Sequence, residues 1–313
     1  MVFKLLANKI GFPWGSTFSL VKTKTGILQR HFRHQNLNAS SKFGLQLASS
    51  RSPFVPAADY HTSNPVQDKG SQNAPSSNIE FAIVPKERAG IISRFLENNY
   101  HKTEPITIAL GMPENEIYGW FPRFINAAMF SSVCDISVEA VDVTMKKRIA
   151  VLSSIIRLPE SVSPNPSDFT DPAKHPVNAQ MNEFFAAVDK GIDPVEILGF
   201  RKEGVVRPKK LEHMYMVVRP EYAGQKIGSR MVSLAEAVAQ NINNCRVGYA
   251  YATSEFSYKI FSKHGYKVVN EIKYADYVNK KGEKIFAGKE ALLGPHLSCR
   301  FMVKELPCMF GDT

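Results

Sequence analysis

The chain has 313 residues and a formal net charge of +10, with 39 Lys and Arg side chains against 29 Asp and Glu. The positive charge is concentrated at the start: residues 1–58 contain eight Lys and Arg and no acidic residue, which leaves +2 for residues 59–313. So small a balance gives no reason to expect a surface that follows nucleic-acid phosphates, which needs basic residues gathered on one face. We therefore expect no nucleic-acid partner.

The remaining composition indicates a globular domain without a metal. Hydrophobic residues make up 44% of the chain and aromatic residues 11%, enough for a substantial core. No apolar run approaches the roughly 18 residues of a membrane span, so we expect no integral membrane segment. The histidines are isolated and no C-x-x-C pair is present, so neither a metal site nor a disulfide scaffold is predicted. The cysteines are Cys134, Cys245, Cys299 and Cys308.

Residues 1–63 have the composition of an organelle transit peptide, because they are rich in Ser, Lys and Arg and almost free of acidic residues. At their start, apolar side chains lie beside Lys4 and Lys9, a pattern consistent with a short basic amphipathic helix. We predict targeting to the mitochondrial matrix, with residues 64–78 as a linker rich in Pro, Ser, Gln and Asn. The alternative is an ordinary disordered basic extension on a cytoplasmic protein.

The folded domain is predicted to begin with a strand at Ile79–Ile83, followed by a helix from Pro85 to about Asn99. A second amphipathic segment at Glu114–Ser131 has helical spacing and is unusually aromatic. Pro122 lies inside this segment, so we expect it to kink the helix or to divide it in two.

Two β-rich runs at Val138–Val143 and Ile149–Ile156 predict a hairpin. The proline-dense stretch after them, from Pro159 to Pro176, is predicted to be a long surface loop, and such loops are often lids or binding segments. Further helices and strands then alternate, which describes an α/β layer fold. Their predicted ranges are Val177–Lys190, Leu211–Val218, 224–243, Arg246–Tyr251, Phe256–Lys263, Tyr266–Tyr274 and Ser298–Glu305.

The most informative segment is the loop Ala223–Ser229, which connects the strand ending at Val218 to a helix. A helix amino terminus favours an anion through its free backbone N–H groups and its dipole. Gly224 and Gly228 would let the backbone approach a phosphate group closely. Neither the G-x-G-x-x-G fingerprint nor a Walker loop is present. Packing at the helix start would explain these glycines about equally well.

This loop resembles the acyl-CoA pyrophosphate loop of the GCN5-related N-acetyltransferase (GNAT) superfamily, whose pattern is Arg or Gln, two residues, Gly, one residue, then Gly or Ala. Ala223 stands in place of the usual Arg or Gln, and Lys226 in place of the first motif Gly. The resemblance implies an α/β GNAT fold, a mixed, mostly antiparallel twisted sheet with helices on both faces, and acetyl-CoA as co-substrate. It assigns CoA binding to Met216, Val217, Val218, Ala223, Gly224, Gln225, Lys226, Ile227, Gly228 and Ser229.

Other segments resemble the insect and nematode type of arylalkylamine N-acetyltransferases. They are a Glu-Pro motif at Thr103–Ile106, a serine-containing turn at Ala252–Tyr258, a helix end with a glycine cap at Phe261–Tyr266, and a Tyr-x-Asp-Tyr segment at Glu271–Tyr277. This ordered similarity covers residues 79–306, which we take as one acyltransferase domain with a tail at 307–313. It implies transfer of an acetyl group to a primary amine, an arylalkylamine or a related small amine.

Aliphatic amines have a pKa of about 10, so a base must remove a proton before or during attack on the thioester. The resemblance assigns this role to Glu104, whose alternative role is to cap a turn before Pro105; Glu212 is the runner-up base. Many superfamily members place a proton-donating Tyr at the position of Phe261. Ser257 and Thr253 are therefore the candidate proton donors, with helix capping as the alternative.

Aromatic side chains are expected to form the walls of the acceptor pocket, although core packing would also explain them. They are Trp120, Phe121, Phe124, Tyr215 and Tyr274. Arg219, Lys226 and Lys259 are candidates for contact with the CoA phosphates, or ordinary surface charges. His296 either borders the pocket or is a hydrogen-bonded structural residue.

Two other functions stay open at this stage. One is a CoA-binding GNAT-like module without catalysis, which the residues at Ala223, Lys226 and Phe261 would favour. The other is acyl transfer to an amino acid or to a protein amino terminus, for which mitochondrial targeting makes metabolic sense. The sequence determines neither the amine nor the oligomeric state, for which we expect a monomer.

Overall fold

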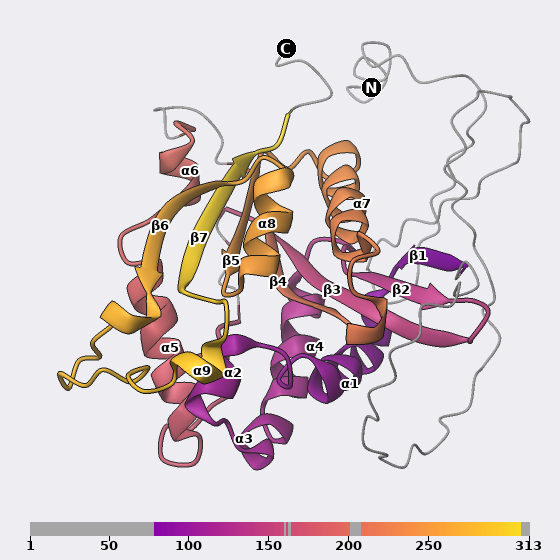
Figure 1. Cartoon of the computed structure of the whole chain (residues 1–313). Helices are drawn as coiled ribbons and strands as arrows, with labels where there is room; N and C mark the ends of the chain where they lie inside the picture. The colour runs from indigo at the N-terminus through magenta and orange to yellow at the C-terminus, as the bar shows by residue number, and fades with distance from the viewer. Residues whose placement is uncertain (1–77, 160, 162–163, 201–207, 308–313) are drawn as a thin grey trace, which may run out of the picture. The chain divides into compact units, whose positions relative to one another are not determined.

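The computed structural model describes residues 78–159, 161, 164–200 and 208–307 (Figure 1). The predicted transit peptide, the predicted linker except its last residue, and the predicted tail except Pro307 lie outside the described residues.

A seven-stranded sheet forms the centre of the described part, in the order β1-β2-β3-β4-β5-β7-β6. Every neighbouring pair is antiparallel except β4 and β5, which are parallel. The strands are β1 (Ile79–Ile83), β2 (Val138–Asp142), β3 (Lys147–Arg157), β4 (Lys210–Val218), β5 (Val247–Ala252), β6 (Lys267–Lys273) and β7 (Ser298–Glu305). This is the mixed, mostly antiparallel sheet that the sequence predicted.

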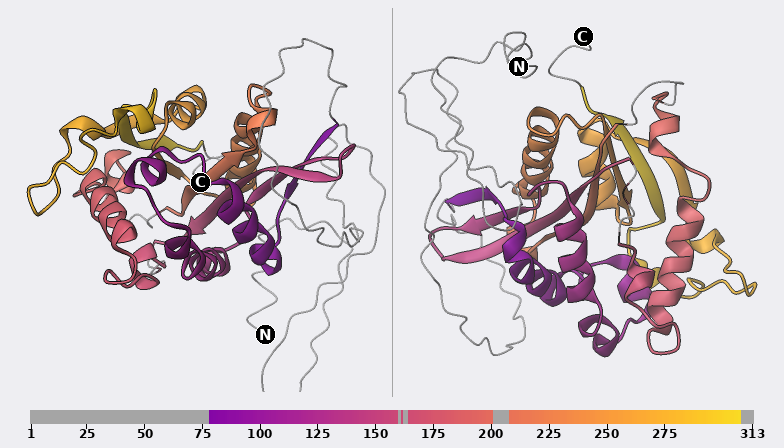
Figure 2. Two further views of the ribbon diagram at one scale, coloured as in Figure 1. Left: turned by 60° about the horizontal axis from the view of Figure 1, so that its bottom comes forward. Right: turned by 180° about the vertical axis from the view of Figure 1, so that it is seen from behind.

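Helices cover both faces of this sheet (Figures 1 and 2). One face packs against α7 and α8, and the other against α1, α4 and α5. The helices are α1 (Ala89–Asn99), α2 (Pro105–Leu110), α3 (Glu114–Tyr118), α4 (Phe121–Ser131), α5 (Pro176–Val188), α6 (Pro194–Ile197), α7 (Ile227–Asn241), α8 (Glu255–Lys263) and α9 (Glu290–Leu293). Short 3-10 turns lie at Lys86–Arg88, Pro166–Asp168, Pro220–Tyr222 and Tyr274–Asp276.

The alternation of side chains along β3 explains why both faces are covered. Ala150 and Leu152 are fully buried in the core under α7, whereas Val151 and Ile155 are buried against α1 and α4. A strand with apolar side chains on both faces needs a layer on each side to remove them from water. The sheet therefore lies between two hydrophobic layers, as α/β folds require.

Two irregularities of β4 shape the middle of the molecule. The strand pairs with β5 only from Lys210 to His213, and its remaining residues, up to Val218, have no partner on that side among the described strands. On its other side, Ser153 pairs with Tyr215 and Ser154 with His213, so Met214 is an extra residue in the register. Such a bulge bends a strand and increases its twist. The strands β4 and β5 consequently separate after their first four pairs.

Most of the predicted elements are confirmed, with ends that coincide with the predicted ones or are displaced by up to four residues. The aromatic segment is divided as Pro122 indicates, because α3 ends at Tyr118 and α4 begins at Phe121. The sequence did not predict α2, α6 and α9, which are only six, four and four residues long. Helices this short show too little periodicity to be recognised.

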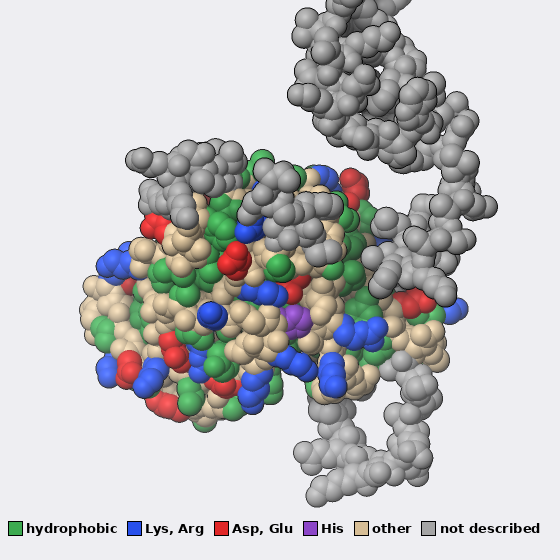
Figure 3. Space-filling model, turned by 90° about the horizontal axis from the view of Figure 1, so that it is seen from above, with side chains coloured by type: hydrophobic (Ala, Val, Ile, Leu, Met, Phe, Trp, Pro, Cys, Tyr) green, Lys and Arg blue, Asp and Glu red, His purple; other side chains and the backbone are tan. Residues whose placement is uncertain are grey.

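The surface and the described helices agree with the small net charge of the domain. On the face drawn in Figure 3, Lys and Arg side chains are interspersed with Asp and Glu and form no single continuous patch. Among the described residues, no helix is long and apolar enough to cross a membrane. The same residues contain no group of three or more His, Cys, Asp or Glu side chains placed to hold a metal ion.

Candidate active site

The amino terminus of α7 has the properties of an anion-binding site. Its N-cap residue, Lys226, makes no side-chain capping hydrogen bond, so the first N–H groups of this 15-residue helix have no intrahelical or N-cap partner. Lys226 adopts the left-handed conformation (φ 60°, ψ 17°), and Gly224 has φ 80°. Residues 223–226 are exposed, so the loop and the helix dipole face solvent where a diphosphate would bind.

Gly228 in the first turn of α7 allows three elements to approach closely. A Cβ atom at this position would lie 2.9 Å from Ile260 Cδ1 on α8 and 3.2 Å from Met216 Sδ on β4. The packing explanation of this glycine is therefore correct, and it coexists with the uncapped helix end. Gly228 seats the amino terminus of α7 against the strand that leads into the loop.

The separation of β4 from β5 leaves the edge of Met216–Val218 next to the α7 amino terminus. Backbone N–H and C=O groups on an open strand edge can pair with an extended ligand as an added strand. The pantetheine arm of CoA carries amide groups suited to such pairing. The predicted CoA-binding residues thus lie on one strand end and the loop that follows it.

The predicted phosphate-binding side chains differ in their exposure and in their contacts with the rest of the protein. Arg219 donates from Nε to the Arg148 carbonyl oxygen at 3.2 Å, and its guanidinium lies 5.5 Å from the Phe95 ring centroid. Lys226 and Lys259 are exposed. Ser229 Oγ is hydrogen-bonded to His264 Nε2 at 2.8 Å. Lys226 and Lys259 are thus the candidates whose side chains are free to approach a phosphate.

A small cavity of about 70 Å³ lies where β4 and β5 separate. It brings together the three predicted catalytic residues, Glu104, Thr253 and Ser257, which come from two segments about 150 residues apart in the sequence. Residues 213–216 of β4 and Phe261 of α8 complete its wall. The strand edge suited to the thioester and the candidate base therefore border the same space.

Glu104 is buried, with 4% of its surface exposed, and its two carboxylate oxygens differ. Oε2 accepts hydrogen bonds from the backbone N–H of Thr107 at 2.6 Å and from the Thr107 hydroxyl at 2.7 Å, which makes Glu104 the N-cap of α2. Oε1 is buried and has no hydrogen-bond partner among the described residues. The capping role therefore holds the carboxylate in place and leaves one oxygen free.

Burial raises the pKa of Glu104 above its ordinary value, because desolvation disfavours the charged form and outweighs the hydrogen bonds from Thr107. The nearby Thr253 hydroxyl also opposes the shift in pKa, although it completes no hydrogen bond to Oε1. A carboxylate whose pKa is raised towards neutrality is a stronger base than an exposed one, as proton abstraction requires. The free Oε1 atom and the raised pKa thus both fit the role of Glu104 as the candidate base.

The two candidate proton donors lie at the start of α8, with Thr253 one residue before the N-cap Ser254 and Ser257 in the first turn. Ser257 forms a capping box with Ser254: its N–H donates to Ser254 Oγ at 3.1 Å, and its hydroxyl donates to the Ser254 carbonyl oxygen at 3.0 Å. Thr253 is buried, and its carbonyl oxygen accepts a hydrogen bond from Tyr274 at 2.6 Å. The capping explanation thus holds for Ser254 and Ser257, whereas the Thr253 hydroxyl takes no part in the capping box of α8.

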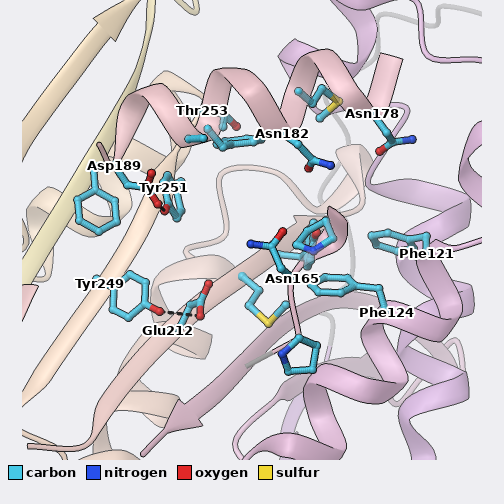
Figure 4. A pocket seen from close by; sticks show the side chains of 18 of the residues that line it. Phe121, Phe124, Asn165, Asn178, Asn182, Asp189, Glu212, Tyr249, Tyr251 and Thr253 are labelled. Carbon is cyan, nitrogen blue, oxygen red and sulfur yellow. Dashed lines mark hydrogen bonds between the residues drawn. The ribbon is translucent and has the colours of Figure 1, made fainter. Parts of the chain in front are cut away.

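A larger cavity of about 540 Å³ adjoins the small one (Figure 4). The two share Tyr100, Met214, Tyr215, Tyr251 and Thr253 as walls. This volume lies within the range of about 300–1,000 Å³ typical of small-molecule sites. An acceptor in the large cavity can therefore present its reacting group to Glu104 and Thr253.

One end of the large cavity is aromatic and is formed by α4 and β4. Phe121 packs edge-on against Trp120 (5.6 Å between ring centroids) and against Tyr215 (5.2 Å), and Phe124 lies beside them. Four of the five predicted aromatic walls are therefore in place. Tyr274 lines neither cavity; it is buried with Phe184 and Phe286 in the core beneath α5.

The other end of the large cavity is polar and is formed by β5, α5 and the start of β4 (Figure 4). Glu212 Oε2 accepts hydrogen bonds from Tyr249 Oη at 2.7 Å and from Arg157 Nε. Burial alone would lower the pKa of Arg157, but the Glu212 carboxylate outweighs it and raises that pKa. Glu212 is thus committed to an ion pair, which argues against its role as the base.

Several site residues carried no signal that we recognised in the sequence. Asp189, at the C-cap of α5, accepts a 2.6 Å hydrogen bond from Tyr251. His101 is buried against Phe121, has no partner for either ring nitrogen among the described residues, and has its pKa lowered to about 4 by burial. The proline-dense loop contributes Pro164, Asn165 and Pro166 to the cavity wall, as expected of a binding segment.

Of its two predicted roles, His296 has the structural one, as a hydrogen-bonded residue outside the cavities. Its Nδ1 accepts a hydrogen bond from the Glu255 N–H at 3.1 Å, and it lines neither cavity. Burial lowers the pKa of this imidazole, which favours the neutral form that can accept at Nδ1. His296 thus stabilises the amino terminus of α8, the helix that carries Ser257.

In the described part of the chain, two central strands of the sheet separate beside an uncapped helix amino terminus. Residues 154–266 match the model of the acetyltransferase (GNAT) family, and the described part has the α/β GNAT fold. No curated protein sequence matches the chain.

Solved structures with the same fold include arylalkylamine N-acetyltransferase 2 from Aedes aegypti, with a TM-score of 0.59 and 18% identity over 74% of this chain and 100% of that chain. A mosquito arylalkylamine N-acetyltransferase-like protein, 5b, has a TM-score of 0.54 and 20% identity over 73% of this chain and 100% of its own. The polyamine N-acetyltransferase of Drosophila melanogaster, which forms N-acetylagmatine, has a TM-score of 0.56 and 16% identity with the same two coverages. At these identities the likeness establishes the fold.

Proposed function

We propose that this protein is an N-acetyltransferase that transfers the acetyl group of acetyl-CoA to a small primary amine, an arylalkylamine or a related amine. The observation that carries the proposal is the buried Glu104 carboxylate, whose free Oε1 lies at the junction of the strand separation and the aromatic cavity. The similar folds of enzymes named for arylalkylamines and for polyamines give further support.

Acetyl-CoA supplies the activated acetyl group, and the described residues fit it at both ends. The uncapped N–H groups at the start of α7 are placed to bind the diphosphate, and the edge of Met216–Val218 to pair with the pantetheine amides. Lys226 adds a positive charge beside the diphosphate position. Both contacts use the backbone, so the departures from the usual motif at Ala223 and Lys226 leave them intact.

The acceptor amine binds in the large cavity, with its apolar body against the rings of Phe121, Phe124 and Tyr215. Its nitrogen lies towards the small cavity, where Glu104 Oε1 accepts a proton directly or through a water molecule. The neutral amine then attacks the thioester carbon. Burial of the site excludes bulk water that would otherwise hydrolyse the thioester.

The leaving thiolate requires a proton, and Phe261 cannot supply it. Thr253 lies in the same small cavity as Glu104, and its hydroxyl is not committed to a cap. We assign Thr253 as the first donor and Ser257, whose hydroxyl is shared with Ser254, as the second. The ammonium loses two protons on its way to the amide: the one taken up by Glu104 reaches the thiolate through one of these hydroxyls, and the second is released to water. The site thus returns to its starting protonation state.

The test is turnover of a panel of primary amines by the purified full-length chain with acetyl-CoA, followed by thiol release and by mass spectrometry of the product. The panel contains arylalkylamines, aliphatic amines, amino acids and a peptide with a free amino terminus. Acetylation of small amines at rates well above the uncatalysed rate is the expected result. Acetylation of amino acids or the peptide alone would change the acceptor class, and CoA binding without acetylation of any acceptor would favour a non-catalytic module.

We further propose that residues 1–63 direct the protein to the mitochondrial matrix. The support is the composition of these residues, which hold eight basic side chains and a single acid, Asp59. A fluorescent reporter fused after residue 70 should colocalise with a matrix marker. A matched fusion with the eight basic residues changed to Gln should be diffuse. Diffuse signal from the unchanged fusion would contradict the proposal.

A further inference from the structure

The polar end of the large cavity contains a carboxylate that the proposed chemistry does not use. Asp189 lines this cavity and is half-buried between α5 and β5. Its Oδ2 accepts the hydrogen bond from Tyr251, and no other hydrogen bond or ion pair to its carboxylate is present among the described residues. One carboxylate oxygen therefore faces the cavity without a protein donor.

The position of Asp189 in its helix adds to this negative charge. It is the C-cap of the 13-residue helix α5, where the helix dipole already places a partial negative charge, and no Lys, Arg or His lies in the last turn. Helices usually end with basic residues because a cation is favourable there. Lys190 follows Asp189 in the chain, but it is exposed and lines neither cavity. The acidic C-cap therefore leaves a spot on the cavity side where a bound cation would be stabilised.

Tyr251 holds this carboxylate in a defined place. Its ring lies between Phe185 (5.4 Å between centroids) and Phe301 (4.8 Å), and it lines both cavities. Tyr251 precedes Thr253 by two residues, and Asp189 lines the large cavity but not the small one that holds Glu104. The position suited to a second cation is therefore separate from the position of the reacting nitrogen.

Beyond Tyr251, the surroundings of the cavity change from negative to positive at Tyr249, the next residue on the same face of β5. Tyr249 lies a further two residues away, beside Glu212, Arg157 and Lys210. Glu212 is paired with Arg157, and Lys210 lines the cavity without an ion pair among the described residues. Two basic side chains against one acidic side chain make this part of the cavity unfavourable for a cation. A second cation is therefore expected at Asp189 and not deeper.

We propose that Asp189 and the carboxyl end of α5 form a binding site for a second cationic group, and that the preferred acceptors are short amines with an ammonium or guanidinium at the far end. This inference rests on the proposed function, because the reacting nitrogen must lie beside Glu104. By standard bond lengths 1,4-diaminobutane spans roughly 6 Å between its nitrogens, so one nitrogen can lie at the small cavity while the other extends into the large one. Longer polyamines would place a cation near Arg157 and Lys210.

The test compares kcat/KM of the full-length protein for 1,4-diaminobutane and n-butylamine, which differ only in the distal ammonium, with 2-phenylethylamine as a reference without a second cation. A hydrogen bond to a charged group should favour the diamine by about 10- to 100-fold. Asp189→Asn should remove this preference and leave kcat/KM for n-butylamine and 2-phenylethylamine within about threefold of the wild-type values. Asp276→Asn, at an exposed acid, is the matched control and should change none of these values.

The outcomes separate this inference from the proposed function. Turnover of all three amines without a preference for the diamine would overturn the cation site and leave the acetyltransferase standing. An equal loss for all three amines in Asp189→Asn would also overturn it, because a merely structural role predicts that result. No turnover of any amine would overturn the proposed function itself. Tyr251→Phe, which retains the carboxylate, provides a second variant and should keep a reduced preference if Asp189→Asn does not fold.

Discussion

At the scale of single residues, Glu104 combines two roles that the sequence presented as alternatives. A residue before a proline at a helix start is expected to cap the helix, and Oε2 does so. The same carboxylate leaves Oε1 buried without a partner, which is unfavourable for folding unless a ligand or water uses it. This free oxygen lies in a cavity next to the strand edge, as a catalytic base requires.

The raised pKa of Glu104 predicts how the reaction depends on pH. The base acts only when deprotonated, so kcat/KM should fall as the pH decreases through this raised pKa, above the ordinary Glu pKa of about 4.3. A pH profile of kcat/KM for one amine should therefore show an acidic limb displaced to higher pH. CoA affinity over the same range serves as the control. An acidic limb that lies at or below the ordinary Glu pKa of about 4.3 would contradict the assignment.

The same pKa also makes a prediction about stability. A raised pKa means that the folded state binds this proton more tightly than the unfolded state, so the stabilisation is complete at low pH and is lost as the pH rises through the folded-state pKa. Glu104→Gln removes this loss, so its free energy of unfolding should increase relative to that of the wild type as the pH rises above the ordinary Glu pKa of about 4.3. Urea unfolding over a series of pH values checks this, and a difference independent of pH would contradict it.

Lys226 carries backbone strain at the CoA loop. A non-glycine residue in the left-handed region is disfavoured by about 1–2 kcal/mol. Lys226→Gly should therefore raise the free energy of unfolding by about 1 kcal/mol, measured by urea denaturation. Lys259→Gly removes the same side chain from an exposed position inside α8 and should lower it by about 1 kcal/mol. A loss of stability in Lys226→Gly would mean that its side chain, and not its backbone, matters for folding.

At the scale of elements, the position of α7 against α8 and β4 depends on Gly228. The methyl group of Gly228→Ala would lie 2.9 Å from Ile260 Cδ1, so the helices must separate or Ile260 must move. We expect a loss of about 1–3 kcal/mol in unfolding free energy, and weaker CoA binding.

Two further variants make this prediction specific to the contact. Ile260→Val removes Cδ1, so the double variant should recover much of the stability lost in Gly228→Ala, a coupling that a double-mutant cycle measures. Gly90→Ala in α1 meets no atom within 4 Å and should be neutral or stabilising. Additive effects of Gly228→Ala and Ile260→Val would show that the contact does not limit the packing of α7.

The elements also show why the site is only partly predictable from sequence. Glu104, Thr253 and Ser257 lie in motifs with a local signature, and they meet in one cavity. Asp189, Tyr251 and His101 have no such signature, because their roles arise from how α5, β5 and α1 are brought together in three dimensions. An acidic C-cap after a last turn without basic residues is the one local signal that would have indicated Asp189.

At the scale of the whole molecule, the order of strands and helices followed from hydrophobic periodicity, because each long element buries one or two continuous faces. The separation of β4 from β5 did not, since it depends on a one-residue bulge at Met214 and on the single parallel pairing in the sheet. No residue of β4 signals where its pairing with β5 ends. The fold was therefore accessible from the sequence, and the shape of the site was not.

The small charge of the folded part fits this account, because the proposed CoA binding relies on backbone N–H groups and a helix dipole with few basic side chains. The protein needs no broad basic surface, and the described face has none (Figure 3). Most of the basic excess in the sequence belongs to residues 1–58, for which we propose a role in targeting.

The central claim is that Glu104 removes the proton of an amine held between the two cavities. The direct test is kcat/KM of Glu104→Gln relative to the wild type, for an amine that the wild type acetylates, with the dissociation constant of CoA measured on both proteins. Gln keeps an oxygen for the Thr107 N–H, so the fold and CoA affinity should be retained while kcat/KM falls about 10²- to 10⁴-fold at neutral pH. Full turnover by Glu104→Gln would contradict the account.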